Sequence, residues 1–171
     1  MRTGQNFWLL YVMLAIVEIL VCNYLQISLY AVISLLPAMI LSIPLQIGTS
    51  ACMLIAFATG LTIDWLSEGF IGLNAASILP VALLRKQIIR IFLGEDLITR
   101  KDSFTFRKNG TMKIAIATTT AVMVYLAVYI FLDGAGTRPM WFNFTRFVIS
   151  TVINSLIALF ITGILTPDDR R

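Results

Sequence analysis

The chain has 171 residues, of which 58% are hydrophobic and 13% charged, and its mean hydropathy is +0.88. Soluble domains carry about 45–50% apolar and roughly 25% charged residues, so this composition excludes most soluble enzymes, and the low charge excludes a disordered chain. The absence of histidine excludes a histidine metal site, a histidine general base and a histidine-containing triad. We therefore expect a polytopic membrane protein built as one compact bundle.

Six apolar segments approach the roughly 17–25 residues that a helix needs to cross a hydrocarbon core of about 30 Å. They are residues 7–24, 27–43, 47–66, 69–86, 114–132 and 144–165. The second segment is short and contains Pro37, and the fourth is long enough only if it continues past Arg85 with basic side chains reaching the interface. The predicted fold class is all-α, a bundle of six transmembrane helices in a single domain, residues 1–171.

Lysine and arginine are distributed unevenly over the predicted connections, which are short except for a polar loop at about residues 94–112. With six spans, two basic residues, Arg138 and Arg146, fall on one side of the membrane. Eleven fall on the other: Arg2, Arg85, Lys86, Arg90, Arg100, Lys101, Arg107, Lys108, Lys113, Arg170 and Arg171. The positive-inside rule then predicts that both termini and the long loop are cytoplasmic.

Apolar and basic residues alternate between Arg85 and Leu93, as expected of a helix that emerges into the headgroup layer. Basic residues beside a cytoplasmic membrane face attract anionic lipid, and the same surface could also dock a cytoplasmic partner. We do not expect nucleic acid to bind, because topology alone accounts for these basic residues.

Glu18 lies in the middle of the first predicted span, where an ionisable group is costly and normally faces the bundle interior. It could be a proton or cation site, or an internal hydrogen-bonding group that fixes packing. Because Glu18 lies six residues before Tyr24, it should be roughly 9 Å below the outer boundary. Arg146 enters the last span from the same side, so we predict that Glu18 and Arg146 approach each other.

Three more acids, Asp64, Glu68 and Asp133, fall at the outer ends of predicted spans. Neighbouring carboxylates could serve acid–base chemistry, but acids at helix boundaries are usually solvated termini. The chain contains no phosphate-binding loop, no Gly-x-Ser-x-Gly elbow and no Cys-x-x-Cys pair, so we expect neither an enzyme nor a cofactor or metal site.

Small residues recur at four-residue spacing, Ala56 with Gly60 and Gly72 with Ala76. This spacing lets helix backbones approach closely inside a membrane, either within the bundle or against the helix of a partner. The two cysteines, Cys22 and Cys52, lie in apolar runs and should pack as small apolar side chains.

The run from Gly60 to Ser67, followed by Gly72-Leu73-Asn74-Ala75, resembles the motif of the MreD family, the bacterial rod shape-determining membrane proteins. In that pattern a Gly-Leu-x-x-Asp-x-x-Ser stretch ends one helix, and a Gly-Leu-His-Ala-like stretch begins the next. The matching residues are Gly60, Leu61, Asp64, Gly72 and Leu73, and this chain departs from the pattern by carrying Asn74 in place of histidine. Physically, Gly60 and Gly72 would permit close helix contact, and Asp64 would accept hydrogen bonds from backbone N–H groups of the turn at residues 69–72.

The resemblance implies a non-enzymatic scaffold in the inner membrane of a bacterium, where it would help position peptidoglycan synthesis. Its implied partners are an MreC-like membrane protein, the actin-like MreB filament and the wall-synthesis enzymes of elongating cells. The alternative is the substrate-binding membrane subunit of a vitamin-type importer, which is also a six-span bundle. That function would need a cavity lined by groups such as Trp65, Trp141, Phe142 and Asn143, which could equally form an ordinary interfacial belt.

Overall fold

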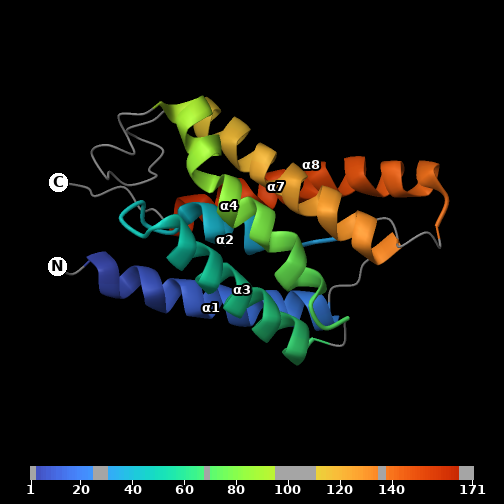
Figure 1. Cartoon of the computed structure of the whole chain (residues 1–171), viewed down its shortest axis with the longest axis horizontal. Helices are drawn as coiled ribbons and strands as arrows, with labels where there is room; N and C mark the ends of the chain where they lie inside the picture. Colours follow the sequence, from blue (N-terminus) through green and yellow to red (C-terminus); the bar gives the residue numbers. More distant parts are fainter. Residues whose placement is uncertain (1–2, 25–30, 68–69, 95–110, 135–137, 166–171) are drawn as a thin grey trace.

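The computed structural model describes residues 3–24, 31–67, 70–94, 111–134 and 138–165, and these residues form six α-helices (Figure 1). The helices are α1 (Thr3–Tyr24), α2 (Leu36–Ser42), α3 (Thr49–Leu66), α4 (Leu73–Leu93), α7 (Thr111–Gly134) and α8 (Met140–Leu165). The described part of the chain is therefore all-helical, as predicted. Four of these helices, α1, α3, α7 and α8, are long and apolar enough to cross a membrane.

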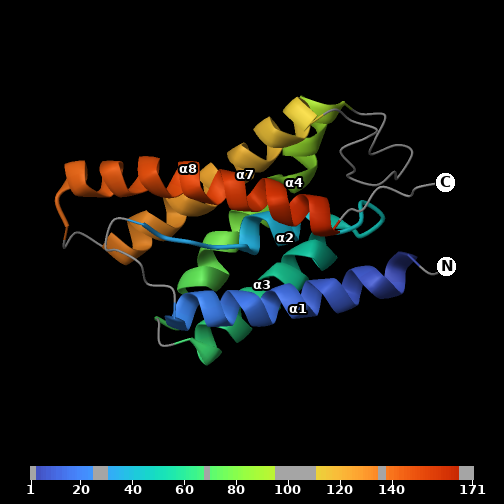
Figure 2. The ribbon, with the colours of Figure 1, turned by 180° about the vertical axis from the view of Figure 1, so that it is seen from behind.

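The long helices are roughly aligned and cross the bundle in alternating directions, so the bundle has two ends (Figures 1 and 2). At the α7–α8 end, on the right of Figure 1, α1, α3 and α7 finish and α4 and α8 begin. At the opposite α4–α7 end, α4 and α8 finish and α1, α3 and α7 begin. Helices α3, α4, α7 and α8 therefore alternate in direction along the chain.

The fourth predicted span, residues 69–86, is displaced along the chain relative to the helix that forms. Helix α4 begins after Gly72 and ends before Gly94, and both glycines have positive φ angles, +95° and +94°. Glycine adopts this conformation without the steric cost that other residues pay, and it commonly stops a helix at the C-terminal side. At 21 residues, α4 is about 31 Å long by its rise per residue.

The prediction of a helix over residues 27–43 is wrong in its described part. Residues 32–35 are non-helical, and the helix that follows, α2, has only seven residues, about 10 Å in length. Pro37 explains where this helix starts, because proline lacks an N–H and is accepted in the first turn of a helix. Residues 27–30 lie outside the described residues.

Helix α2 lies at the centre of the bundle, with α8 on one side and α1 and α3 on the other (Figure 2). All seven of its residues are buried, and five of them join a hydrophobic core to which all six helices contribute. By contrast, α1 and α8 carry rows of exposed apolar side chains on their outer faces, including Leu9, Val12, Leu156 and Phe160. Such faces suit contact with lipid rather than with water.

Candidate functional site

Buried polar side chains form several groups, and the first surrounds Asp64 at the end of α3. Asp64 is 1% exposed and accepts hydrogen bonds from the backbone N–H groups of Gly72 (3.0 Å), Asn74 (3.1 Å) and Ala75 (3.0 Å). A fourth donor is the Asn74 side-chain amide at 2.9 Å. Helix starts leave backbone N–H groups without partners, and a carboxylate there also complements the helix dipole. The predicted acceptor role of Asp64 is confirmed, with donors that lie at and just beyond the end of the predicted turn.

The two glycines beside this carboxylate have different roles. A Cβ atom on Gly60 would lie 2.6 Å from the Cα atom of Ala75, so only glycine allows α3 and α4 to approach this closely. A Cβ atom on Gly72 would meet nothing within 4 Å, and this residue is required for its φ of +95°. The prediction of close helix contact is therefore confirmed for Gly60 and wrong for Gly72. Ala76, expected to share that contact face, is exposed.

Asn74 connects Asp64 with α7. Its amide N–H₂ donates to Asp64, and its carbonyl oxygen accepts a hydrogen bond from the hydroxyl of Tyr125. Tyr125 is fully buried between these helices. Sequence reasoning did not identify Tyr125, which stands in an apolar run where nothing sets it apart.

The second polar group begins with Glu18 and holds the start of α2. Both carboxylate oxygens are used: one accepts from the Ser34 hydroxyl at 2.6 Å, and the other accepts from the Leu35 backbone N–H at 2.8 Å. Ser34 in turn accepts from the backbone N–H of Leu36 at 3.3 Å. Glu18 is fully buried, so its expected position in the bundle interior is confirmed. The predicted approach to Arg146 is wrong, because Arg146 pairs with Asp133 instead.

The non-helical residues ahead of α2 are held by side chains of α8. The N–H of Val32 donates to the Ser150 hydroxyl at 2.9 Å, and the N–H of Ser34 donates to the Asn154 side-chain oxygen at 2.7 Å. The Asn154 amide donates to the Val32 carbonyl. Irregular backbone at membrane depth is tolerated only where protein or water satisfies its polar groups, and these side chains meet that requirement.

Arg85 holds the other end of α2. Its guanidinium donates to the carbonyl oxygens of Leu41 (3.3 Å) and Ile43, and it also contacts the Cys52 sulfur at 3.8 Å. Only 1% of Arg85 is exposed, so the prediction that it belongs to a basic membrane-surface group is wrong. The physical reason is that α2 is too short to satisfy its own terminal carbonyls, and a cation at a helix C-terminus also complements the dipole.

A separate ion pair lies at the α7–α8 end. Asp133, at the end of α7, pairs with Arg146 of α8, while Arg138 Nη1 is 3.9 Å from the same carboxylate oxygen. The Arg138 guanidinium lies over the Phe142 ring, 5.5 Å from its centroid.

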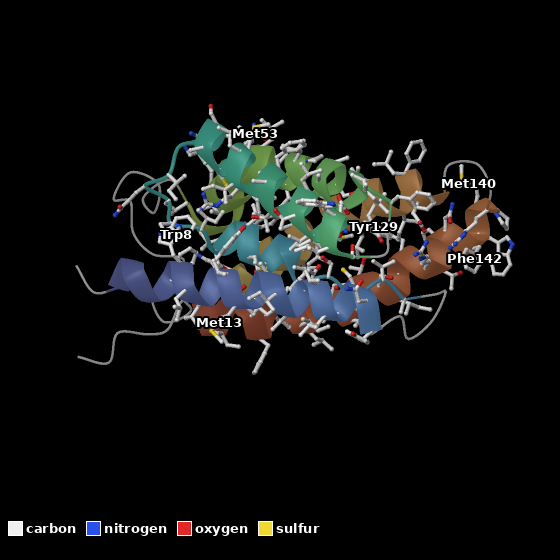
Figure 3. All side chains as sticks on the ribbon, turned by 90° about the horizontal axis from the view of Figure 1, so that it is seen from below. Trp8, Met13, Met53, Tyr129, Met140 and Phe142 are labelled. Atoms are coloured by element: carbon white, nitrogen blue, oxygen red, sulfur yellow. The ribbon has the colours of Figure 1, made fainter. Side chains whose placement is uncertain are left out.

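The other sequence-predicted residues lie on the surface or outside the described residues. Trp65 and Trp141 are exposed, and Met140 and Phe142 lie at the tip of α8 in Figure 3. Of the remaining basic residues predicted at the cytoplasmic surface, Lys86 is half-buried and Arg90 exposed. Of the MreD-like positions, Leu61 is exposed and Leu73 half-buried. Eight predicted residues fall outside the described residues: Arg2, Glu68, Arg100, Lys101, Arg107, Lys108, Arg170 and Arg171.

The buried charged side chains of this region form hydrogen bonds mainly with backbone groups. The carboxylates of Glu18 and Asp64 and the guanidinium of Arg85 all bond to main-chain groups at helix ends. Within the described residues, no group of three or more Cys, Asp or Glu side chains could hold a metal ion. Comparison with known proteins found no matching family model, no matching curated protein and no matching solved structure.

Proposed function

We propose that the protein is a non-enzymatic membrane scaffold of the MreD type, which helps to organise wall synthesis in elongating bacteria. The observation that carries this proposal is the folding of the MreD-like stretch into one contact unit. Gly60 lets α3 meet α4, and Asp64 holds the first turn of α4. The MreD-like stretch thus fixes the hairpin of α3 and α4. In this proposal, the outer surface of the hairpin binds a partner.

The departure from the MreD pattern at Asn74 fits this architecture. A neutral imidazole offers one donor and one acceptor, and the Asn74 amide uses one of each, toward Asp64 and from Tyr125. The side chain at this position therefore has to accept one hydrogen bond and donate another, linking Asp64 with Tyr125, and does not have to be titratable.

The same proposal includes a topology with six crossings, with the sixth made by the segment of residues 31–42. With residues 31–34 counted as extended and residues 35–42 at the helical rise, this segment spans about 25 Å, close to the thickness of a hydrocarbon core. In this topology the α4–α7 end is cytoplasmic, in agreement with the distribution of lysine and arginine.

The importer alternative has less support from the geometry. It requires Trp65, Trp141, Phe142 and Asn143 to face a common cavity. Trp65 and Trp141 are instead 77% and 66% exposed, Phe142 lies against Arg138, and Asn143 packs against Gly134.

Depletion and affinity purification test the scaffold proposal together. We expect depletion of the protein in its own rod-shaped host to make the cells round, because wall synthesis loses its spatial organisation. We also expect a single-span, coiled-coil MreC-like protein to copurify with the tagged chain in mild detergent. Re-expression of a Gly48→Ala variant should restore the shape, since a methyl group there meets nothing within 4 Å. Retention of rod shape after depletion, with no such partner recovered, would refute the scaffold function.

A further inference from the structure

Arg138 and Arg146 compete for a single carboxylate, and Arg146 is the closer of the two. Arg146 Nη1 hydrogen-bonds to Asp133, whereas Arg138 Nη1 is 3.9 Å from the same oxygen, beyond hydrogen-bonding distance. Two guanidinium groups around one carboxylate leave a local excess of one positive charge in this cluster of three side chains.

Among the residues that the structure describes, three buried polar atoms in this cluster have no hydrogen-bond partner: Arg138 Nη1, Arg146 Nε and Asn143 Oδ1. An unsatisfied buried donor is costly, more so when it belongs to a charged group, and it calls for a partner. The two unsatisfied guanidinium donors favour an anionic acceptor. Arg138 is the accessible member, since 32% of its side chain is exposed compared with 10% for Arg146.

The surroundings indicate which anion would arrive. The first turns of α8 carry exposed apolar and aromatic side chains, with Met140 at 87%, Trp141 at 66% and Phe144 at 69% exposure. Tryptophan and neighbouring aromatic residues at a helix end mark the boundary between hydrocarbon and headgroups. Arginine is suited to phosphate, because its planar fork can donate two hydrogen bonds to two oxygens.

We propose that Arg138, supported by Arg146, binds the phosphate group of an anionic lipid at the α7–α8 end. The Phe142 ring holds the Arg138 guanidinium from one face. Arg146 takes the hydrogen bond to Asp133, which leaves Arg138 in a weaker ion pair at 3.9 Å from the same carboxylate. This site lies at the opposite end of the bundle from the basic residues that the sequence assigned to lipid, and it does not depend on the scaffold function.

Native mass spectrometry of the full-length protein in mild detergent tests the site, with phosphatidylglycerol as the probe and phosphatidylcholine as the neutral comparison. Arg138→Gln should weaken the tightest phosphatidylglycerol binding about tenfold, which corresponds to losing a hydrogen bond to a charged group. Lys113→Gln is the matched control, because Lys113 is an exposed cation at the other end of the bundle, and it should leave that binding event in place. Asp133→Asn should strengthen binding, since it removes the competing carboxylate.

The outcomes separate clearly. Equal binding of phosphatidylglycerol by the wild type and by Arg138→Gln would overturn the proposal, as would equal binding of the two lipids by the wild type. If inorganic phosphate displaces phosphatidylglycerol from the wild type but not from Arg138→Gln, the phosphate chemistry is confirmed and free phosphate becomes a second source. The Arg138→Gln comparison decides the matter even if Asp133→Asn fails to fold.

Discussion

Gly60 and Asp64 lie one helical turn apart on α3, and both act on the first turn of α4. Gly60 sets how closely the two helices approach, and Asp64 sets where α4 begins. Small substitutions at these two positions, Gly60→Ala and Asp64→Asn, should therefore disturb the α3–α4 hairpin more than larger substitutions elsewhere on α3.

We predict that Gly60→Ala destabilises the protein by about 1–3 kcal/mol, the usual cost of overpacking a tight contact. The added Cβ would lie 2.6 Å from backbone, which cannot move aside as the end of a flexible side chain can. Thermal unfolding in detergent measures the effect. Gly48→Ala, which adds the same methyl group in open space, should cost less than about 1 kcal/mol, and equal losses in the two variants would contradict the contact.

Asp64→Asn should lower the free energy of unfolding by about 2–3 kcal/mol, because an amide replaces a carboxylate that accepts four hydrogen bonds. Thr62→Val is a suitable comparison, since Thr62 is exposed and its hydroxyl bonds only within α3. Urea or thermal unfolding of both variants provides the measurement. Wild-type stability in Asp64→Asn would show that the carboxylate does not organise this turn.

At the scale of elements, α2 is a short helix held at both ends by charges of the appropriate sign. Glu18 lies at its N-terminal side and Arg85 at its C-terminal side, so each complements the end of the helix dipole that it meets. A seven-residue helix has little stability of its own, and its position depends on these tertiary contacts.

Arg85→Met should therefore destabilise the protein by about 1–3 kcal/mol, the cost of leaving buried acceptors without their donor. The carbonyl groups of Leu41 and Ile43 would be left buried without this donor. The neighbouring substitution Lys86→Met removes the same charge from a half-buried side chain and should have a small effect. Similar melting temperatures for the two variants would argue against the C-terminal contact.

At the scale of the whole molecule, the two ends of the bundle should face opposite sides of the membrane. Met140→Cys and Lys113→Cys place reporter thiols at exposed positions at the two ends. In a chain without its native cysteines, a membrane-impermeant maleimide applied to intact cells should label Met140→Cys and spare Lys113→Cys until the cells are opened. The reverse pattern would show that the topology is inverted. Labelling of both variants in intact cells would contradict the placement of the two ends on opposite sides of the membrane.

Sequence reasoning predicted the long helices well, because apolar length is a strong and local signal. It also predicted the acceptor role of Asp64, because that signal is local as well. An acid placed just before a turn meets free backbone N–H groups nearby in the chain. It failed for the described part of the predicted span at residues 27–43, because apolar composition does not distinguish a spanning helix from a short buried helix with a non-helical lead.

The partners of Arg85 and Arg146 could not be predicted, because they depend on the rotation of each helix about its axis. Arg85 turns inward to α2 instead of outward to lipid, and Arg146 meets Asp133 instead of Glu18. Ser150 and Asn154 gave a usable signal that was missed: two polar residues four positions apart share one face of an otherwise apolar helix.

The contacts between Val32, Ser34 and α8 join positions separated by 118 to 122 residues. During synthesis, the ribosome therefore releases residues 31–42 long before it makes the α8 side chains that satisfy the backbone of this segment. Stable burial of this segment must wait for the final helix, and a nascent chain halted before Ser150 should leave it open to protease.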